Sequence, residues 1–179
     1  MNSENFYDCI AEQYDSYFQD VESKEQDLRV ANHINHFKDF RVLDVGCGTG
    51  LLLEMFDIKH YTGIDPSQGM LDVLSNKFPN KHIVCSTFEE YMGSASNYDV
   101  LISLYGSISY VQPYMFNLFD KWILKNKDYF FMFYTKGYDP ITYEKACKNN
   151  KFNNLEEYDL VSGNCYIEGN YTIYTSLTL

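Results

Sequence analysis

The chain has 179 residues, of which 45% are hydrophobic and 22% charged, so it is long enough to bury one core without disulfides. Its net charge is −11 and its basic residues form no cluster, which argues against a nucleic-acid partner. No apolar run approaches the roughly 18 residues of a membrane span, and the amino-terminal residues lack the pattern of a signal peptide. We therefore expect a cytoplasmic protein with no membrane partner.

The first forty residues predict an N-terminal helical segment (1–40). The stretch from Phe6 to Phe40 reads as helical, and in its second half Val30, Ile34 and Phe37 recur with the spacing of one helix face. This apolar stripe indicates a helix that packs on the rest of the chain.

An alternation of strands and helices follows. Five apolar runs rich in branched and aromatic residues predict buried strands, at residues 41–45, 60–64, 82–85, 99–105 and 128–135. Apolar residues recur with helical period between them, over residues 70–78 and again over residues 116–123. Strands that alternate with helices in this way are typical of a parallel sheet covered on both faces.

The last part of the chain departs from that alternation. Residues 154–161 and 171–179 predict two further strands, with turns at Gly163 and Gly169. We therefore expect an α/β fold with a doubly wound, seven-stranded, mostly parallel sheet and one antiparallel strand near its edge. No linker or break in composition divides the sequence, which predicts a single domain over residues 1–179.

The most specific pattern is a strand that runs directly into a glycine-rich loop. Residues 42–45 read VLDV and residues 46–50 read GCGTG, and glycines there let the backbone approach a ligand closely. Asp65 ends the next strand, where a carboxylate can accept hydrogen bonds from ribose hydroxyl groups. A nicotinamide dinucleotide site requires G-x-G-x-x-G, but Leu51 stands where its last glycine belongs.

VLDVGCGTG at residues 42–50, followed by GIDPS at residues 63–67, resembles the cofactor site of class I S-adenosylmethionine-dependent methyltransferases of the small-molecule type. The resemblance implies a Rossmann-like fold, S-adenosylmethionine as cofactor with S-adenosylhomocysteine as product, and no metal. It places Asp44 near the methionine amino group, directly or through water, and Asp65 at the ribose. The cofactor-binding residues that it implies are Tyr14, Asp44, Gly46, Cys47, Gly48, Asp65, Pro66, Met70, Thr87, Phe88 and Leu104.

Some of these residues have a second interpretation. Cys47 is either a nucleophile or, more simply, a small residue that fills the turn. Phe88 either packs against the adenine or belongs to the core. Relatives often carry an acid near residues 86–87 that meets the adenine amine, and this chain has none, so we expect backbone groups at Thr87 and Phe88 to contact the adenine. Pro66 suits a first helical turn with Asp65 as its cap.

The resemblance places the methyl acceptor between the N-terminal segment and the loop after the fourth strand. YDCIAEQYD at residues 7–15 resembles a segment that closes over the cofactor in small-molecule methyltransferases, and an ordinary packing helix is the alternative. By this resemblance Tyr14 and Tyr105 face each other across the methyl donor. The sequence singles out no catalytic residue, and the substrate-side candidates are Tyr7, Tyr105 and Ser109.

The function implied by the resemblance is methyl transfer from S-adenosylmethionine to an oxygen or nitrogen of a small-molecule metabolite. The loop after the fourth strand lacks the N/D-P-P-Y signature of enzymes that methylate bases, glutamine or similar planar amines. The alternative is a methyltransferase-like cofactor-binding or regulatory subunit without catalysis of its own. The sequence after the fifth strand is short, so we expect no large lid, and a homodimer is one way to complete the site.

Overall fold

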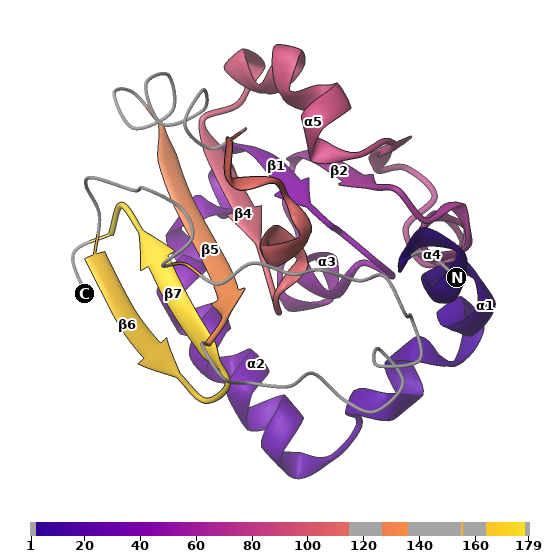
Figure 1. Ribbon diagram of the computed structural model, residues 1–179, viewed down its shortest axis with the longest axis horizontal. Coiled ribbons are helices and arrows are strands. Elements are labelled where there is room, and N and C mark those ends of the chain that lie inside the picture. The colour runs from indigo at the N-terminus through magenta and orange to yellow at the C-terminus, as the bar shows by residue number, and fades with distance from the viewer. Residues whose placement is uncertain (1–2, 115–126, 136–154, 156–163, 178–179) are drawn as a thin grey trace.

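Seven strands form one sheet in the part of the chain that the computed structural model describes, residues 3–114, 127–135, 155 and 164–177 (Figure 1). Across the sheet their order is β3-β2-β1-β4-β5-β7-β6. The strands are β1 Arg41–Val45, β2 His60–Asp65, β3 His82–Cys85, β4 Val100–Ser103, β5 Asp128–Tyr134, β6 Asn164–Glu168 and β7 Tyr171–Thr175. Four of the first five strands therefore lie at or within the ranges that the sequence predicts, and β2 extends one residue beyond its predicted range, to Asp65.

The direction of β7 confirms the predicted mixed sheet. The first five strands pair in parallel with their neighbours, whereas β7 pairs antiparallel with both β5 and β6. The hairpin between β6 and β7 turns at Gly169, whose φ is 57°, as the sequence predicts. The strand before this turn is Asn164–Glu168, which the sequence analysis missed, and the strand predicted at 154–161 lies outside the described residues except for Leu155.

The helices cover the sheet from both sides. Their bounds are α1 Ser3–Tyr14, α2 Val21–Ile34, α3 Leu51–Met55, α4 Gln68–Lys77 and α5 Phe88–Tyr91, with short 3-10 helices η1 Asp15–Phe18, η2 Asn35–Asp39, η3 Met92–Asn97 and η4 Ser107–Tyr110. The N-terminal segment is two α-helices and not one, because the Asp20 carboxylate caps α2 by accepting the Ser23 N–H at 2.9 Å. The helix predicted over 116–123 lies outside the described residues.

Alternating residues of the central strands form a core on each face of the sheet. Val42, Val100 and Phe130 pack with buried residues of α2, α3 and α4 on one face. Leu43, Val45, Leu101 and Phe131 pack on the other face with Phe88 of α5 and Ile108 of η4. Because successive side chains of a strand point to opposite faces, these strands carry buried apolar residues on both faces.

The carboxyl ends of β1, β2 and β4 meet at one edge of the sheet, where the chain turns into loops. The β4 strand ends at Ser103, two residues earlier than predicted, because Tyr105 adopts a left-handed backbone conformation with φ 50°. In doubly wound sheets this edge is where ligands bind.

Candidate functional site

The loop after β1 depends on glycine at three positions. Gly46, Gly48 and Gly50 have φ values of 72°, 52° and 98°, which glycine adopts most readily. A side chain on Gly46 would also overlap the side chain of Ser107. The loop is held by the N–H groups of Gly46 and Cys47, which both donate to the Ile64 carbonyl, at 2.8 and 3.0 Å.

Asp65 braces this loop from the end of β2. Its carboxylate accepts the Gly48 N–H at 3.0 Å and the Ser67 N–H at 2.9 Å. Burial raises the pKa of Asp65 to about 6, although these two hydrogen bonds act to lower it. Each carboxylate oxygen has two lone pairs, so Asp65 retains the capacity to accept further hydrogen bonds from a ligand.

The sequence predicted that Asp65 caps α4, but the structure shows another N-cap. The N-cap is Ser67, whose hydroxyl accepts the Met70 N–H at 3.2 Å, and Pro66 precedes the helix. Asp65 is therefore left to hold the loop and to face the cavity described below.

Asp44 lies at the end of β1 and is almost completely buried, with 2% of its surface exposed. Its carboxylate accepts a hydrogen bond from the Tyr61 hydroxyl at 2.9 Å. Burial raises the pKa of Asp44 to about 7, the Tyr61 hydrogen bond opposes that rise, and repulsion from Asp65 adds to it. A buried carboxylate with a raised pKa gains strongly from a bound cation.

Tyr61 is a site residue that the sequence did not predict. Its hydroxyl reaches Asp44 because the residue two further along β2 is Gly63, where a Cβ would lie 2.6 Å from that hydroxyl. A tyrosine followed at i+2 by glycine in a strand was thus the available signal, because a glycine inside a strand marks a close approach by another group.

A cavity of about 280 Å³ opens at this edge of the sheet. All eleven residues that the sequence analysis proposed for cofactor binding line it, and so do the substrate-side candidates Tyr7 and Tyr105. The sequence analysis did not assign Glu4, Glu89 or Tyr134, which also line it. The structure therefore brings residues from the N-terminal segment and from the ends of five strands around one space.

Ser109 lies apart from this cavity. Its side chain is fully buried, and its hydroxyl accepts the Tyr134 N–H of β5 at 2.9 Å. The hydroxyl in this stretch that lines the cavity is that of Ser107, which donates to the Gly46 carbonyl at 3.3 Å. Ser109 is therefore a structural contact between η4 and β5, which corrects its place among the catalytic candidates.

Tyr105 is anchored to two other elements. Its hydroxyl donates to Asp27 of α2 at 2.5 Å, and its ring packs edge-on against Tyr171 of β7 at 5.4 Å between centroids. Burial and the bond to Asp27 raise the pKa of the Tyr105 hydroxyl above its ordinary range, so it stays protonated. Tyr14 contacts the rings of Tyr7 and Phe18. That Tyr14 and Tyr105 face each other across a ligand stays a prediction.

The structure also shows the surroundings of Cys47 and Phe88, the two residues for which the sequence allows two interpretations. Cys47 is buried, and burial raises the pKa of its thiol well above the ordinary value, so it lacks the thiolate that a nucleophile needs. Phe88 lines the cavity and belongs to the core at once. The Thr87 N–H donates to the Glu90 carboxylate at 3.2 Å in a capping box, so one of the backbone groups at Thr87 and Phe88 that the sequence predicts at the adenine already has a partner.

Within the described residues, no group of three or more His, Cys, Asp or Glu side chains is arranged to hold a metal ion. No helix in the same part of the chain is long and apolar enough to cross a bilayer.

Comparison with known proteins agrees with this geometry. Residues 42–123 match a family model described as a methyltransferase domain. The chain is 33% identical over 78 residues to the ubiquinone/menaquinone biosynthesis C-methyltransferase UbiE of Campylobacter jejuni, a match that covers 38% of this chain and 33% of that protein. The chain thus spans about a third of the length of these curated relatives.

Solved structures share the fold. A DhpI complex with S-adenosylhomocysteine superposes with a TM-score of 0.57 at 14% identity, over 74% of this chain and 67% of that one. DesVI of Streptomyces venezuelae superposes with a TM-score of 0.52 at 13% identity, over 73% and 60% of the two chains. At these identities the likeness concerns the fold.

Proposed function

We propose that this chain, which belongs to the class I S-adenosylmethionine-dependent methyltransferases, binds S-adenosylmethionine in the cavity and methylates a small molecule. The observation that carries this proposal is that two carboxylates, the buried Asp44 and the partly buried Asp65, line one cavity together with the glycine loop. We also propose that residues 1–179 form a single domain, because the described elements from α1 to β7 pack on one sheet.

The residues present fit this cofactor. The buried Asp44 carboxylate suits an ammonium group, and the lone pairs of Asp65 suit the two hydroxyls of a ribose. Pro66, Met70 and Phe88 supply apolar surface for an adenine. When bound, S-adenosylmethionine supplies a methyl group on a positively charged sulfur, and the lining contains tyrosines, whose rings attract such a charge when it lies over their faces.

The charge of the lining favours a neutral or cationic acceptor. Its carboxylates are Glu4, Asp44, Asp65 and Glu89, and no lysine, arginine or histidine lines the cavity within the described residues. An anionic acceptor would meet repulsion there. A neutral amine attacks the methyl group through its nitrogen lone pair and can release its proton to solvent afterwards. A hydroxyl acceptor gains more from a base that removes its proton, and the Tyr105 hydroxyl stays protonated. Of the two acceptor atoms, oxygen and nitrogen, we therefore propose that the preferred methyl acceptor is the nitrogen of an amine.

The test is transfer of labelled methyl from S-adenosylmethionine to panels of amines, uncharged hydroxyl compounds and carboxylic acids. We expect label in amines, with hydroxyl compounds second. If carboxylic acids incorporate more label than the amines and the hydroxyl compounds, the proposed neutral or cationic acceptor is wrong. The Campylobacter relatives are named as C-methyltransferases, so product analysis should separate nitrogen from carbon methylation. Binding of S-adenosylhomocysteine without transfer to any acceptor would favour the alternative, a cofactor-binding or regulatory subunit.

Tyr14 should contribute to cofactor affinity through its ring and not its hydroxyl. Tyr14→Phe keeps the ring and should be mild, whereas Tyr14→Ala should weaken S-adenosylmethionine binding by about 2- to 30-fold, the equivalent of one cation–π contact. Tyr17→Ala is the control, since Tyr17 lies on the same segment with 46% of its surface exposed. Equilibrium binding and turnover should both be measured. If Tyr14→Ala matches wild type in both, the N-terminal segment only packs against the rest of the chain and does not contribute to cofactor binding.

A further inference from the structure

The N-terminal helix presents two neighbouring rows of side chains to the rest of the molecule. Tyr7 and Tyr14 line the cavity, and their spacing of seven residues, about two helical turns, places them on one face. Asp8 and Asp15 follow each tyrosine by one residue and form the adjacent row, which contacts α4 and the glycine loop. Each aspartate is therefore next in sequence to a tyrosine of the cavity.

Asp8 contacts the start of α4. Its carboxylate accepts the Ser67 hydroxyl at 2.7 Å and the Gly69 N–H at 2.8 Å, at a helix terminus that favours negative charge. A Cβ on Gly69 would lie 2.9 Å from the Asp8 Cα, so the two backbones approach closely. Ser67 also donates its N–H to Asp65, which connects this contact to the proposed ribose site.

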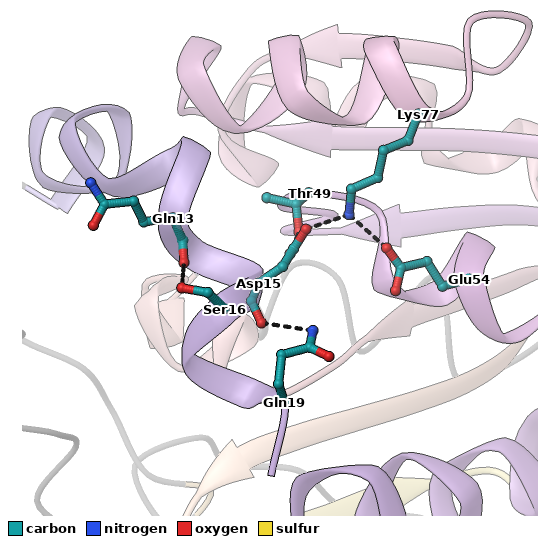
Figure 2. A network of polar contacts seen from close by, with 7 residues as sticks. All are labelled: Gln13, Asp15, Ser16, Gln19, Thr49, Glu54 and Lys77. Carbon is teal, nitrogen blue, oxygen red and sulfur yellow. Dashed lines mark hydrogen bonds and ion pairs between the residues drawn. The ribbon is translucent and has the colours of Figure 1, made fainter.

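Asp15 contacts the other end of α4 and the glycine loop together (Figure 2). Its carboxylate accepts the Thr49 hydroxyl at 2.5 Å and pairs with Lys77 at 2.5 Å. Lys77 is the last residue of α4 and pairs at the same time with Glu54 of α3, at 2.6 Å. Thr49 is buried and follows Gly48, whose N–H is held by Asp65.

We propose that Asp8 and Asp15 are positioning residues that fasten the N-terminal segment to the cofactor loop and so slow the release of the cofactor. We call Asp8, Asp15, Thr49 and Lys77 the N-terminal clamp. The clamp holds Tyr7 and Tyr14 at the cavity from both ends of α4. Its role in release rests on the proposed function, whereas its role in fastening the helix does not.

Hydrogen exchange of residues 3–18 tests the fastening in the ligand-free protein. In Asp15→Ala these amides should exchange about tenfold faster than in wild type. The segment has to break the contacts of Asp15 when it opens locally, and the variant lacks these contacts, so its opening costs less free energy. Thr49→Val removes the hydroxyl and keeps the shape, and it should add little on the Asp15→Ala background if the two side chains act as a pair. Glu12→Gln is the matched control, since it removes one negative charge from an exposed position of α1, three residues before Asp15.

The dissociation rate of S-adenosylhomocysteine, measured by stopped flow, tests the effect on the site. It should rise about tenfold in Asp15→Ala and stay at the wild-type value in Glu12→Gln. Wild-type rates of both exchange and dissociation in Asp15→Ala would overturn the clamp, as would equal changes in Glu12→Gln. If wild-type protein fails to bind S-adenosylhomocysteine, the proposed function is wrong, and the exchange measurement still decides the fastening.

Discussion

Asp44→Asn should weaken binding of S-adenosylhomocysteine by about 100-fold or more, because a ligand ammonium would lose its buried carboxylate partner. Asparagine has nearly the same shape, and its oxygen can still accept the Tyr61 hydroxyl, so the geometry of β1 and β2 should persist. Titration calorimetry of the variant beside wild type measures the effect. An affinity within twofold of wild type would show that the ammonium is bound elsewhere.

The same variant should be more stable than wild type in the absence of ligand. The pKa of Asp44 is about 7 in the folded chain, above its ordinary value of 3.8, so the folded state binds this proton more tightly than the unfolded state does. The stabilisation that this gives is complete below pH 3.8 and is lost as the pH rises through about 7. Asparagine avoids that loss, so the stability advantage of Asp44→Asn should grow between those pH values, as denaturant unfolding can measure.

Ligand binding should show the opposite dependence on pH. An ammonium requires the ionised carboxylate, so the affinity for S-adenosylhomocysteine should fall by about tenfold per pH unit below about 7. Binding near pH 7 should release protons from Asp44, which calorimetry in buffers of different ionisation enthalpy detects. Asp44→Asn should abolish the Asp44 part of this release, and undiminished release from that variant would assign it to another group.

Asp65→Ala should have the other large effect. The variant would lose the two proposed hydrogen bonds to ribose hydroxyls, about 1.5–3 kcal/mol each, together with the observed contacts that hold Gly48 and Ser67. We therefore expect the dissociation constant for S-adenosylhomocysteine to rise by at least about 100-fold.

The control for Asp65 is Asp72→Ala, which removes an exposed carboxylate from α4. Circular dichroism should show that both variants fold, and calorimetry should show a loss of affinity in Asp65→Ala alone. Equal affinities for the two variants would mean that Asp65 only braces the loop.

The sequence predicted which residues gather at the cavity, because many of them come from one short stretch of chain. Asp44, the glycine loop and Asp65 lie at consecutive strand ends, and a parallel sheet brings such ends to one edge. A second local signal predicted the antiparallel strand β7 near the edge of the sheet. It follows a tight turn, and a strand that follows such a turn pairs antiparallel with the strand before it.

Residues that depend on tertiary contacts could not be predicted in this way. The Tyr61 hydroxyl reaches Asp44 on the neighbouring strand, and the glycine at residue 63 indicates a close approach there but not its partner. Ser109 bonds to the backbone of β5, a contact that no local pattern indicates. The contact of Asp15 with Thr49 joins residues 34 positions apart. Helical periodicity predicted a helix at that point of the chain but not what it packs against.

The most direct test of this account is titration calorimetry of the wild-type chain with S-adenosylhomocysteine and, in parallel, with NAD. The account predicts saturable binding of S-adenosylhomocysteine at one site and no binding of NAD. It also predicts that the bound product stabilises the fold, by about 2.7 kcal/mol at 100 times its dissociation constant. Binding of NAD together with no binding of S-adenosylhomocysteine would contradict the account.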